Sequence, residues 1–501
     1  MAGLKSLAKQ TAVYGASSII GRFLNYLLVP LYTAKLSAAS GGYGVVTNVY
    51  AIVALLLVCL TYGMETGFFR FANKKEEDTS LVYSTVLIGV GTSSLLFVLL
   101  SLFFLPAISG FLGYQEHPEF IGMMLVVVAM DAFQSILFAH LRYQNRALTF
   151  ATYKLLFIVG NILVNLFFFL WAPLIYQAHP AWIAWLYDPS YGVGYAFLAN
   201  LICTSFIMLL FFPELCKVHF RYDGALMKRI FRYSFPILIL GLVGILNQTI
   251  DKILFPFLMG QTPEATMQLG IYGAASKVAM IMMMFTQAFR YAYEPFVFGK
   301  SQDKDNKETY AQVMKYFIIF SLLAFLGVMF YLDFFRFIIA PDYWEGLKVV
   351  PIVMAASLFM GVYFNLSFWY KLIDETRWGA YLSLIGCTIV IAINVLFVPI
   401  YGYIACAWAG FVGYAVAMLL SYGLGQRKYP IDYPLVAIGK YVLLAIVLYL
   451  LHLSLNFLDA SLLVKMMIRT SLLACFVAYI VRCDLPLQSL PFVGRFFKSR
   501  K

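Results

Sequence analysis

Charged residues are scarce in this sequence, and their scarcity decides its class. Asp, Glu, Lys and Arg make up 12% of the 501 residues, whereas soluble domains carry about 25%. Hydrophobic residues make up 62% and form long apolar runs that recur along the whole chain. Strands of a membrane barrel would show short alternating segments instead. The sequence therefore predicts an all-α integral membrane protein that lies in a lipid bilayer.

The motifs of several catalytic classes are also missing. The sequence has no GxxxxGK[ST] loop, no HExxH, no GxSxG and no connection long enough for a soluble domain. Its seven cysteines form no CxxC pair, and its five histidines are scattered without metal-ligand spacing. We therefore expect a protein that is not an enzyme and has no cofactor or metal. The net charge of +12 does not indicate nucleic acid, because most basic residues lie in short connections between apolar runs.

Fourteen apolar runs are long enough to cross a bilayer as helices, which takes about 20 residues. These predicted spans cover residues 11–36, 43–64, 80–105, 120–143, 150–171, 192–212, 230–258, 269–298, 310–332, 349–372, 378–398, 403–425, 435–457 and 461–481.

The placement of Lys and Arg supports this count. The two tails and the even-numbered connections hold 27 of these residues, the odd-numbered connections hold four, and five lie deeper within spans. Basic residues collect on the cytoplasmic side of membrane proteins, and a missed span would scramble the bias. We therefore expect a multi-pass membrane protein with both termini in the cytoplasm.

Short sequence echoes recur six spans apart. The segment 42–47 (GYGVVT) resembles 271–276 (IYGAAS), and 191–196 (YGVGYA) resembles 401–405 (YGYIA). An even offset gives both halves the same orientation in the membrane. We expect two pseudo-symmetric six-helix lobes around a central cavity, an N-lobe of residues 1–213 and a C-lobe of 214–425. Two extra helices and a basic tail occupy residues 426–501.

The first predicted span carries a charge near its middle. Arg22 shares one helical face with Gly15, Ser18 and Asn25. A charge at the bilayer centre costs about 2.5–3.5 kcal/mol on insertion scales, so it normally faces protein or water. We interpret this face as one wall of a polar cavity. The alternatives are an arginine that snorkels to the interface or one that pairs with a buried carboxylate.

Other spans carry further polar candidates. Lys277 would add a second positive charge to the cavity from the opposite half, and two such cations favour an anionic substrate such as a diphosphate. Arg290 is a further candidate for substrate binding, with a role as an interfacial anchor as the alternative. Asp131 and Asp251 are candidates for coupling to protons or sodium ions, with fixed interhelical ion pairs as the alternative.

Several segments together resemble a known family. They are residues 9–15 (KQTAVYG), 22–25 (RFLN), 63–71 (GMETGFFRF) and 394–402 (NVLFVPIYG). In combination and order they resemble the polysaccharide-transporter branch of the multidrug/oligosaccharidyl-lipid/polysaccharide exporter superfamily. The resemblance covers essentially the whole chain.

The resemblance implies a flippase of the bacterial cytoplasmic membrane. It would move an undecaprenyl-diphosphate-linked oligosaccharide from the inner to the outer leaflet for O-antigen or capsule synthesis. The resemblance also implies alternating access and cationic residues in spans one and eight, where Arg22 and Lys277 stand. One alternative is a cation-coupled multidrug exporter of the sister branch, which would need an anionic cavity. Another is a membrane-embedded polysaccharide polymerase or ligase, which would need a large outer loop with catalytic residues.

Overall fold

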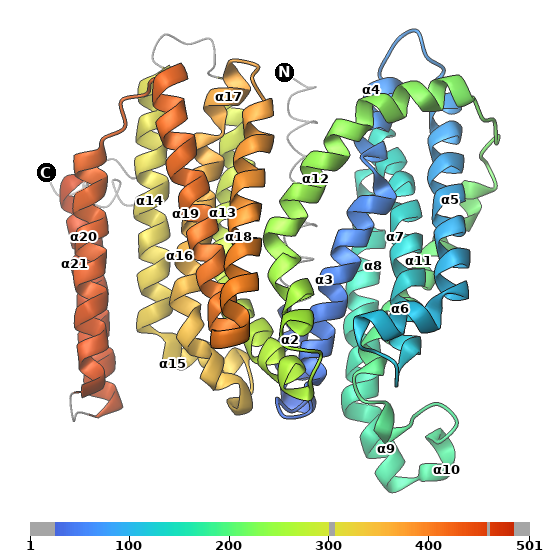
Figure 1. The fold of residues 1–501 in the computed structure, drawn as a ribbon, viewed down its shortest axis with the longest axis horizontal. Coiled ribbons are helices and arrows are strands. Elements are labelled where there is room, and N and C mark those ends of the chain that lie inside the picture. The colour runs from blue at the N-terminus through green and yellow to red at the C-terminus, as the bar shows by residue number, and fades with distance from the viewer. Residues whose placement is uncertain (1–25, 300–305, 458–460, 485–501) are drawn as a thin grey trace, which may run out of the picture. The chain divides into compact units, whose positions relative to one another are not determined.

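The computed structural model describes residues 26–299, 306–457 and 461–484. For residues 291–299, 306 and 456 it describes the backbone only. This part of the chain contains thirteen helices long and apolar enough to cross a membrane. Each corresponds to one predicted span, from the second to the fourteenth. The first predicted span falls mostly on residues outside the described part. The all-α membrane fold is thus confirmed (Figure 1).

The chain divides into two compact units, Met1–Ala274 with Asn394–Tyr403, and Ala275–Ile393 with Ile404–Lys501. These units do not coincide with the predicted lobes, because the seventh span belongs to the first unit; the lobe boundaries stay a prediction. The first unit contains α2 (Leu28–Lys35), α3 (Gly42–Thr61), α4 (Met64–Ala72), α5 (Thr79–Phe103), α6 (Leu105–Leu112), α7 (Pro118–Tyr143), α8 (Ala147–Leu166), η1 (Phe167–Trp171), α9 (Ala172–Ala178), α10 (Pro180–Ile183), η2 (Pro189–Tyr191), α11 (Gly194–Leu215) and α12 (Gly224–Leu258).

Three helices contribute residues to both units: α13 (Pro263–Gly299), α18 (Arg377–Tyr401) and, through Tyr403 alone, α19 (Tyr403–Lys428). The second unit contains α14 (Asn306–Phe330), α15 (Leu332–Phe335), η3 (Arg336–Ile338), η4 (Pro341–Val349), α16 (Val350–Leu366), α17 (Phe368–Leu372), α20 (Leu435–Ser454), η5 (Leu455–Phe457) and α21 (Leu462–Cys483).

Local sequence explains where several helices begin and break. The side chain of Asp223 accepts hydrogen bonds from the backbone of Ala225 and Leu226 and so caps α12. Asp78 caps α5 in the same way through Ser80. The second span breaks between α3 and α4, where Gly63 has a φ of +73°. That left-handed conformation suits glycine, because it has no Cβ.

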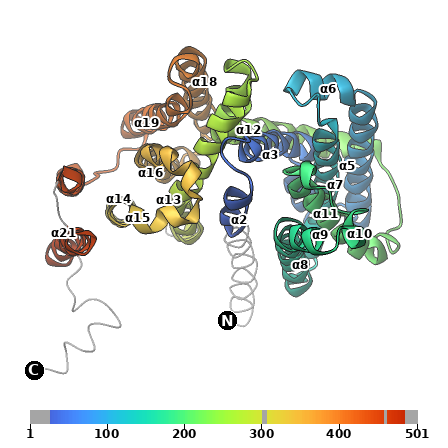
Figure 2. The same cartoon turned by 90° about the horizontal axis from the view of Figure 1, so that it is seen from below.

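In the first unit, α12 crosses α3 while α5, α7 and α11 lie side by side, as both views show (Figures 1 and 2). With 35 residues at about 1.5 Å each, α12 is roughly 52 Å long. Apolar side chains of α4, α5, α7, α11 and α12 form a core cluster that includes Phe68, Val86, Ile136, Phe211 and Ile230. Because lipid tails are as apolar as these side chains, close packing between the helices rather than removal from water stabilises the cluster.

The two glycine-containing echo segments pack against each other's helices. A Cβ at Gly44 of α3 would lie 1.8 Å from the carbonyl oxygen of Thr266 in α13. A Cβ at Gly273 of α13 would lie 2.3 Å from Oγ1 of Thr47. Glycine therefore allows the backbones of α3 and α13 to approach more closely than any side chain would permit. The second echo segment lies inside α13 rather than at its start, because that helix begins at Pro263.

In the second unit, α20 and α21 both pack on α14 (Figure 1). At one end of α21, Asp484 accepts two hydrogen bonds of 2.6 Å each, one from Lys315 and one from Tyr441. Nearer the other end, the buried Arg469 forms an ion pair with Asp333, the second residue of α15. Charged contacts therefore hold the last helix to its neighbours at two levels.

Candidate functional site

Two of the predicted substrate-binding residues, Arg22 and Asn25, lie outside the described residues. The other two lie on α13. Lys277 is partly buried, and Arg290 is exposed, with its guanidinium carbon 4.9 Å from the ring centre of Phe364. Thirteen residues of helix separate the two cations by about 20 Å along the axis. A single phosphate group therefore cannot contact both at once, and their roles in substrate binding stay predictions.

Asp251 is buried in α12 and has two partners. The ammonium of Lys252 lies 3.0 Å from its Oδ2, and the hydroxyl of Tyr272 in α13 donates a hydrogen bond of 2.7 Å to the same oxygen. Lys252 also donates to the backbone carbonyl of Gln248, 3.1 Å away. The positive charge of Lys252 balances the carboxylate, which lowers the cost of keeping both inside the protein.

The same cluster continues into α3. The side-chain nitrogen of Asn48 donates a hydrogen bond of 2.8 Å to the backbone carbonyl of Lys252. The side-chain oxygen of Asn48 accepts a hydrogen bond of 2.8 Å from the hydroxyl of Tyr114. Asn48 is buried. These bonds join α3, α12 and the loop after α6, so this asparagine links helices, which is the ordinary role of amide side chains in membranes.

Asp131 lies in α7, partly buried. Its Oδ1 lies 3.5 Å from the hydroxyl of Thr204 in α11, and its charge interacts with that of Lys154 in α8. The ammonium of Lys154 lies 4.0 Å from the ring centre of Phe138. Lys154 lies within α8 and is partly buried. Asp131 is thus one member of a charged group inside the first unit.

A second ion pair lies near this group. Arg142 of α7 binds Glu65 of α4, and the charges of both act on Lys154. The guanidinium carbon of Arg142 also lies 5.1 Å from the ring centre of Phe69. Two acidic and two basic side chains therefore share one region of the unit. Each charge in this group has an opposite charge nearby, which lowers the cost of holding it inside the protein.

A ladder of buried hydrogen bonds runs along α8 beyond Lys154. The hydroxyl of Tyr32 donates a hydrogen bond of 2.8 Å to Asn165. Asn165 donates one of 3.1 Å to the side chain of Asn161, which donates one of 3.3 Å to Asn200. Asn200 in turn donates to the hydroxyl of Tyr50. The ladder ties α2, α3, α8 and α11 together, as expected for amides inside membrane proteins.

Sequence reasoning missed many members of these clusters, among them Glu65, Lys154 and Tyr272. Lys154 had a usable signal, because Asn161 and Asn165 follow it after seven and eleven residues, a spacing that places all three on one helical face. Glu65 and Tyr272 had none, because each binds a residue on another helix and periodicity does not show which helix faces it. Within the described ranges, no three His, Cys, Asp or Glu side chains are placed to hold a metal ion.

Comparisons with known proteins supply the family and the fold. A family model described as "Polysaccharide biosynthesis protein" matches residues 7–292, more than half of the chain. The structure resembles that of the lipid II flippase MurJ in an inward closed conformation, with a TM-score of 0.69 and 16% identity over 95% of this chain and 99% of that one. No curated protein sequence matches the chain.

Multidrug transporters have a similar structure. An inward-facing multidrug resistance MATE family transporter of the MOP superfamily gives a TM-score of 0.61 at 16% identity, over 83% of this chain and 95% of that one. The MATE multidrug transporter DinF-BH gives a TM-score of 0.58 at 18% identity, over 84% of this chain and 95% of that one. At these identities the likeness concerns the fold.

Proposed function

Because this chain belongs to the polysaccharide biosynthesis protein family and has the fold of the MOP superfamily transporters, we propose that it is a flippase for a polyprenyl-diphosphate-linked oligosaccharide. It moves this lipid across the bacterial cytoplasmic membrane by alternating access, with both of its termini in the cytoplasm. The observation that carries the proposal is the family match over residues 7–292, joined to a fold shared with a lipid II flippase.

The physical task explains why a protein is needed. A diphosphate and its sugars cannot cross about 30 Å of hydrocarbon unaided, because removing charged and polar groups from water costs too much. A transporter replaces that water with its own polar and cationic groups, while the lipid tail stays in the bilayer. Arg22 and Lys277 bind the diphosphate in this proposal, and Asn25 binds a sugar hydroxyl. Arg290 contacts the headgroup at another stage of its path.

In this proposal Asp131 and Asp251 couple transport to protons or sodium ions, and the two carboxylates have different neighbours. Asp251 already has Lys252 and Tyr272 as close partners, so a proton or a sodium ion must compete with an existing ion pair. Asp131 has a 3.5 Å contact with Thr204, at the outer limit of a hydrogen bond, and the charge of Lys154 acts on it without a direct ion pair among the described residues. A carboxylate with weaker partners gains more from binding a cation. We therefore assign the main coupling role to Asp131.

The experiment measures translocation of a fluorescent polyprenyl-diphosphate-linked oligosaccharide in vesicles that contain the purified protein. The double variant Arg22→Ala/Lys277→Ala should lose transport by at least about tenfold, since loss of one charge-assisted hydrogen bond costs about 1.5–3 kcal/mol. Lys348→Ala is the control, because this lysine is about half exposed and its ion pair with Glu345 lies at the surface. Full transport by the double variant would refute the proposed binding roles, and no transport by the wild-type protein would refute the substrate.

A further inference from the structure

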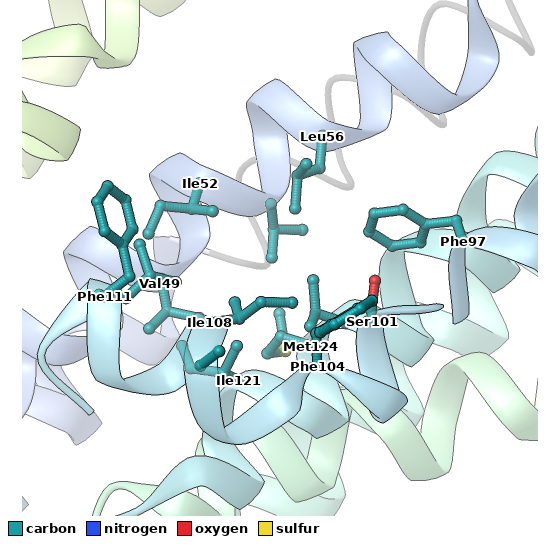
Figure 3. A pocket seen from close by; sticks show the side chains of 14 residues that line it. Val49, Ile52, Leu56, Phe97, Ser101, Phe104, Ile108, Phe111, Ile121 and Met124 are labelled. Carbon is teal, nitrogen blue, oxygen red and sulfur yellow. The ribbon is translucent and has the colours of Figure 1, made fainter. Parts of the chain in front are cut away.

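A pocket of about 490 Å³ lies in the first unit between α3, α5, α6 and α7 (Figure 3). Its floor is formed by buried side chains, among them Val49, Ile121 and Met124. Ala107 and Phe111 of α6 also line it but are exposed, so they mark its mouth. Apart from the hydroxyl of Ser101, the fourteen lining side chains are all apolar.

The surface around this pocket is suited to hydrocarbon. Leu96, Leu99 and Phe103 of α5 are all more than half exposed, and the last reaches 77%. In a multi-pass membrane protein such a surface meets lipid tails. The residues after α6 are polar and exposed, including Gln115 and His117. These residues place the membrane–water interface just beyond the α6 end of the pocket.

A pocket of this kind cannot remain empty at low cost. Its lining atoms lack dispersion contacts wherever nothing fills the space, and those contacts are worth about 0.1–0.2 kcal/mol per atom pair. Water is a poor occupant, because a buried water typically needs two to four polar partners and Ser101 supplies one side chain. The neighbouring bilayer supplies hydrocarbon at high local concentration. The chemistry of the lining and its surroundings therefore favours a lipid chain.

The size of the pocket narrows the choice. An apolar cavity of about 150 Å³ in another protein admits one benzene ring, so 490 Å³ has room for roughly 16 to 20 carbon atoms. One acyl chain of a phospholipid has about this number of carbon atoms. We propose that this pocket binds one acyl chain of a phospholipid from the leaflet beside residues 113–117, with the headgroup at the interface. The inference is independent of the flippase proposal.

The test uses the full-length protein in nanodiscs with a phosphatidylglycerol that carries a diazirine in one acyl chain. After irradiation, mass spectrometry of peptides locates the labelled residues. Wild-type protein should be labelled in peptides that cover residues 97–125. Ala107→Trp should remove most of this labelling, because the indole fills space at the mouth of the pocket that the acyl chain would occupy.

The matched control is Leu99→Trp, which adds the same side chain to an exposed position of α5 outside the pocket and should leave the labelling unchanged. Ile108→Trp serves as a second filled variant if Ala107→Trp does not elute as a monodisperse protein. Equal labelling of wild-type and filled proteins would overturn the inference. So would protection of the wild-type peptides by polyprenyl phosphate but not by unlabelled phosphatidylglycerol, which would assign the pocket to an isoprenoid chain.

Discussion

Removing Asp333 from its ion pair with Arg469 should destabilise the protein far more than removing Arg469. Arg469 lies in α21 with 6% of its side chain exposed, whereas 36% of the Asp333 side chain is exposed. Asp333 also lies 3.8 Å from Arg336, which is itself 36% exposed and has access to water. Loss of Asp333 therefore leaves one buried guanidinium without its acidic partner.

The expected cost follows from these exposures. Breaking a buried ion pair by removing one partner costs about 3–5 kcal/mol, because the remaining charge is uncompensated. Asp333 is about one-third exposed, and water can take part of its place, so we expect about 2–3 kcal/mol for Asp333→Ala. In Arg469→Met the charge that remains is the exposed one. That variant should lie within about 1 kcal/mol of the wild-type protein, because an apolar side chain suits the buried position.

Thermal stability in detergent, followed by the monodisperse fraction after heating, ranks the variants. Asp333→Ala should melt at the lowest temperature, Arg469→Met near the wild type, and the double variant clearly above Asp333→Ala. A hydrogen bond of 2.8 Å between Tyr331 and Thr470 remains in all of them. If Arg469→Met is as unstable as Asp333→Ala, or if the double variant shows no recovery, the reasoning from an uncompensated buried charge is wrong.

Two further predictions concern stability. Burial opposes ionisation of Asp484, but its hydrogen bonds to Lys315 and Tyr441 outweigh burial and hold its pKa below the ordinary value. A lowered pKa in the folded state gives stability that is present above about pH 4 and is lost on further acidification. Asp484→Asn should therefore melt at a lower temperature than the wild type at pH 7, and the difference in melting temperature should shrink near pH 3. A difference in melting temperature that does not change with pH would contradict this. Gly44→Ala should cost at least about 1–3 kcal/mol in thermal stability through its clash with Thr266. Gly410→Ala, which meets no atom within 4 Å, is the control, and equal melting of the two variants would refute the packing argument.

The spans were predictable because a bilayer imposes a length and an apolar composition on every helix that crosses it. Helix ends were less predictable. The predicted fifth span ended at Trp171, but the helix continues through the π-helical turn η1 into α9 and ends at Ala178. Pro173 would ordinarily interrupt a helix, because its ring clashes with the carbonyl four residues earlier. The wider π-helical turn just before it is a common way to relieve such strain within a helix.

The partners of the buried charges could not be read from the sequence. Asp251 pairs with its neighbour Lys252 and with Tyr272, although helical spacing also places Asn247 and Gln248 within its reach, one turn away. Those two amides donate to backbone carbonyls of their own helix. Arg142 binds Glu65, 77 residues earlier. Contacts of this kind depend on how helices pack, and hydrophobic periodicity gives the buried face of a helix without naming what lies opposite.

The length of α12 makes the lipid environment a variable of this protein. At roughly 52 Å the helix exceeds the full thickness of a bilayer with its headgroups, about 40–45 Å, so it must tilt or extend into the aqueous phase. Its first turns carry Lys228, Arg229 and Arg232, which anionic lipids attract. Membranes of different thickness or surface charge will therefore favour different tilts of this one helix, and reconstitutions in unlike lipids should give unlike activities.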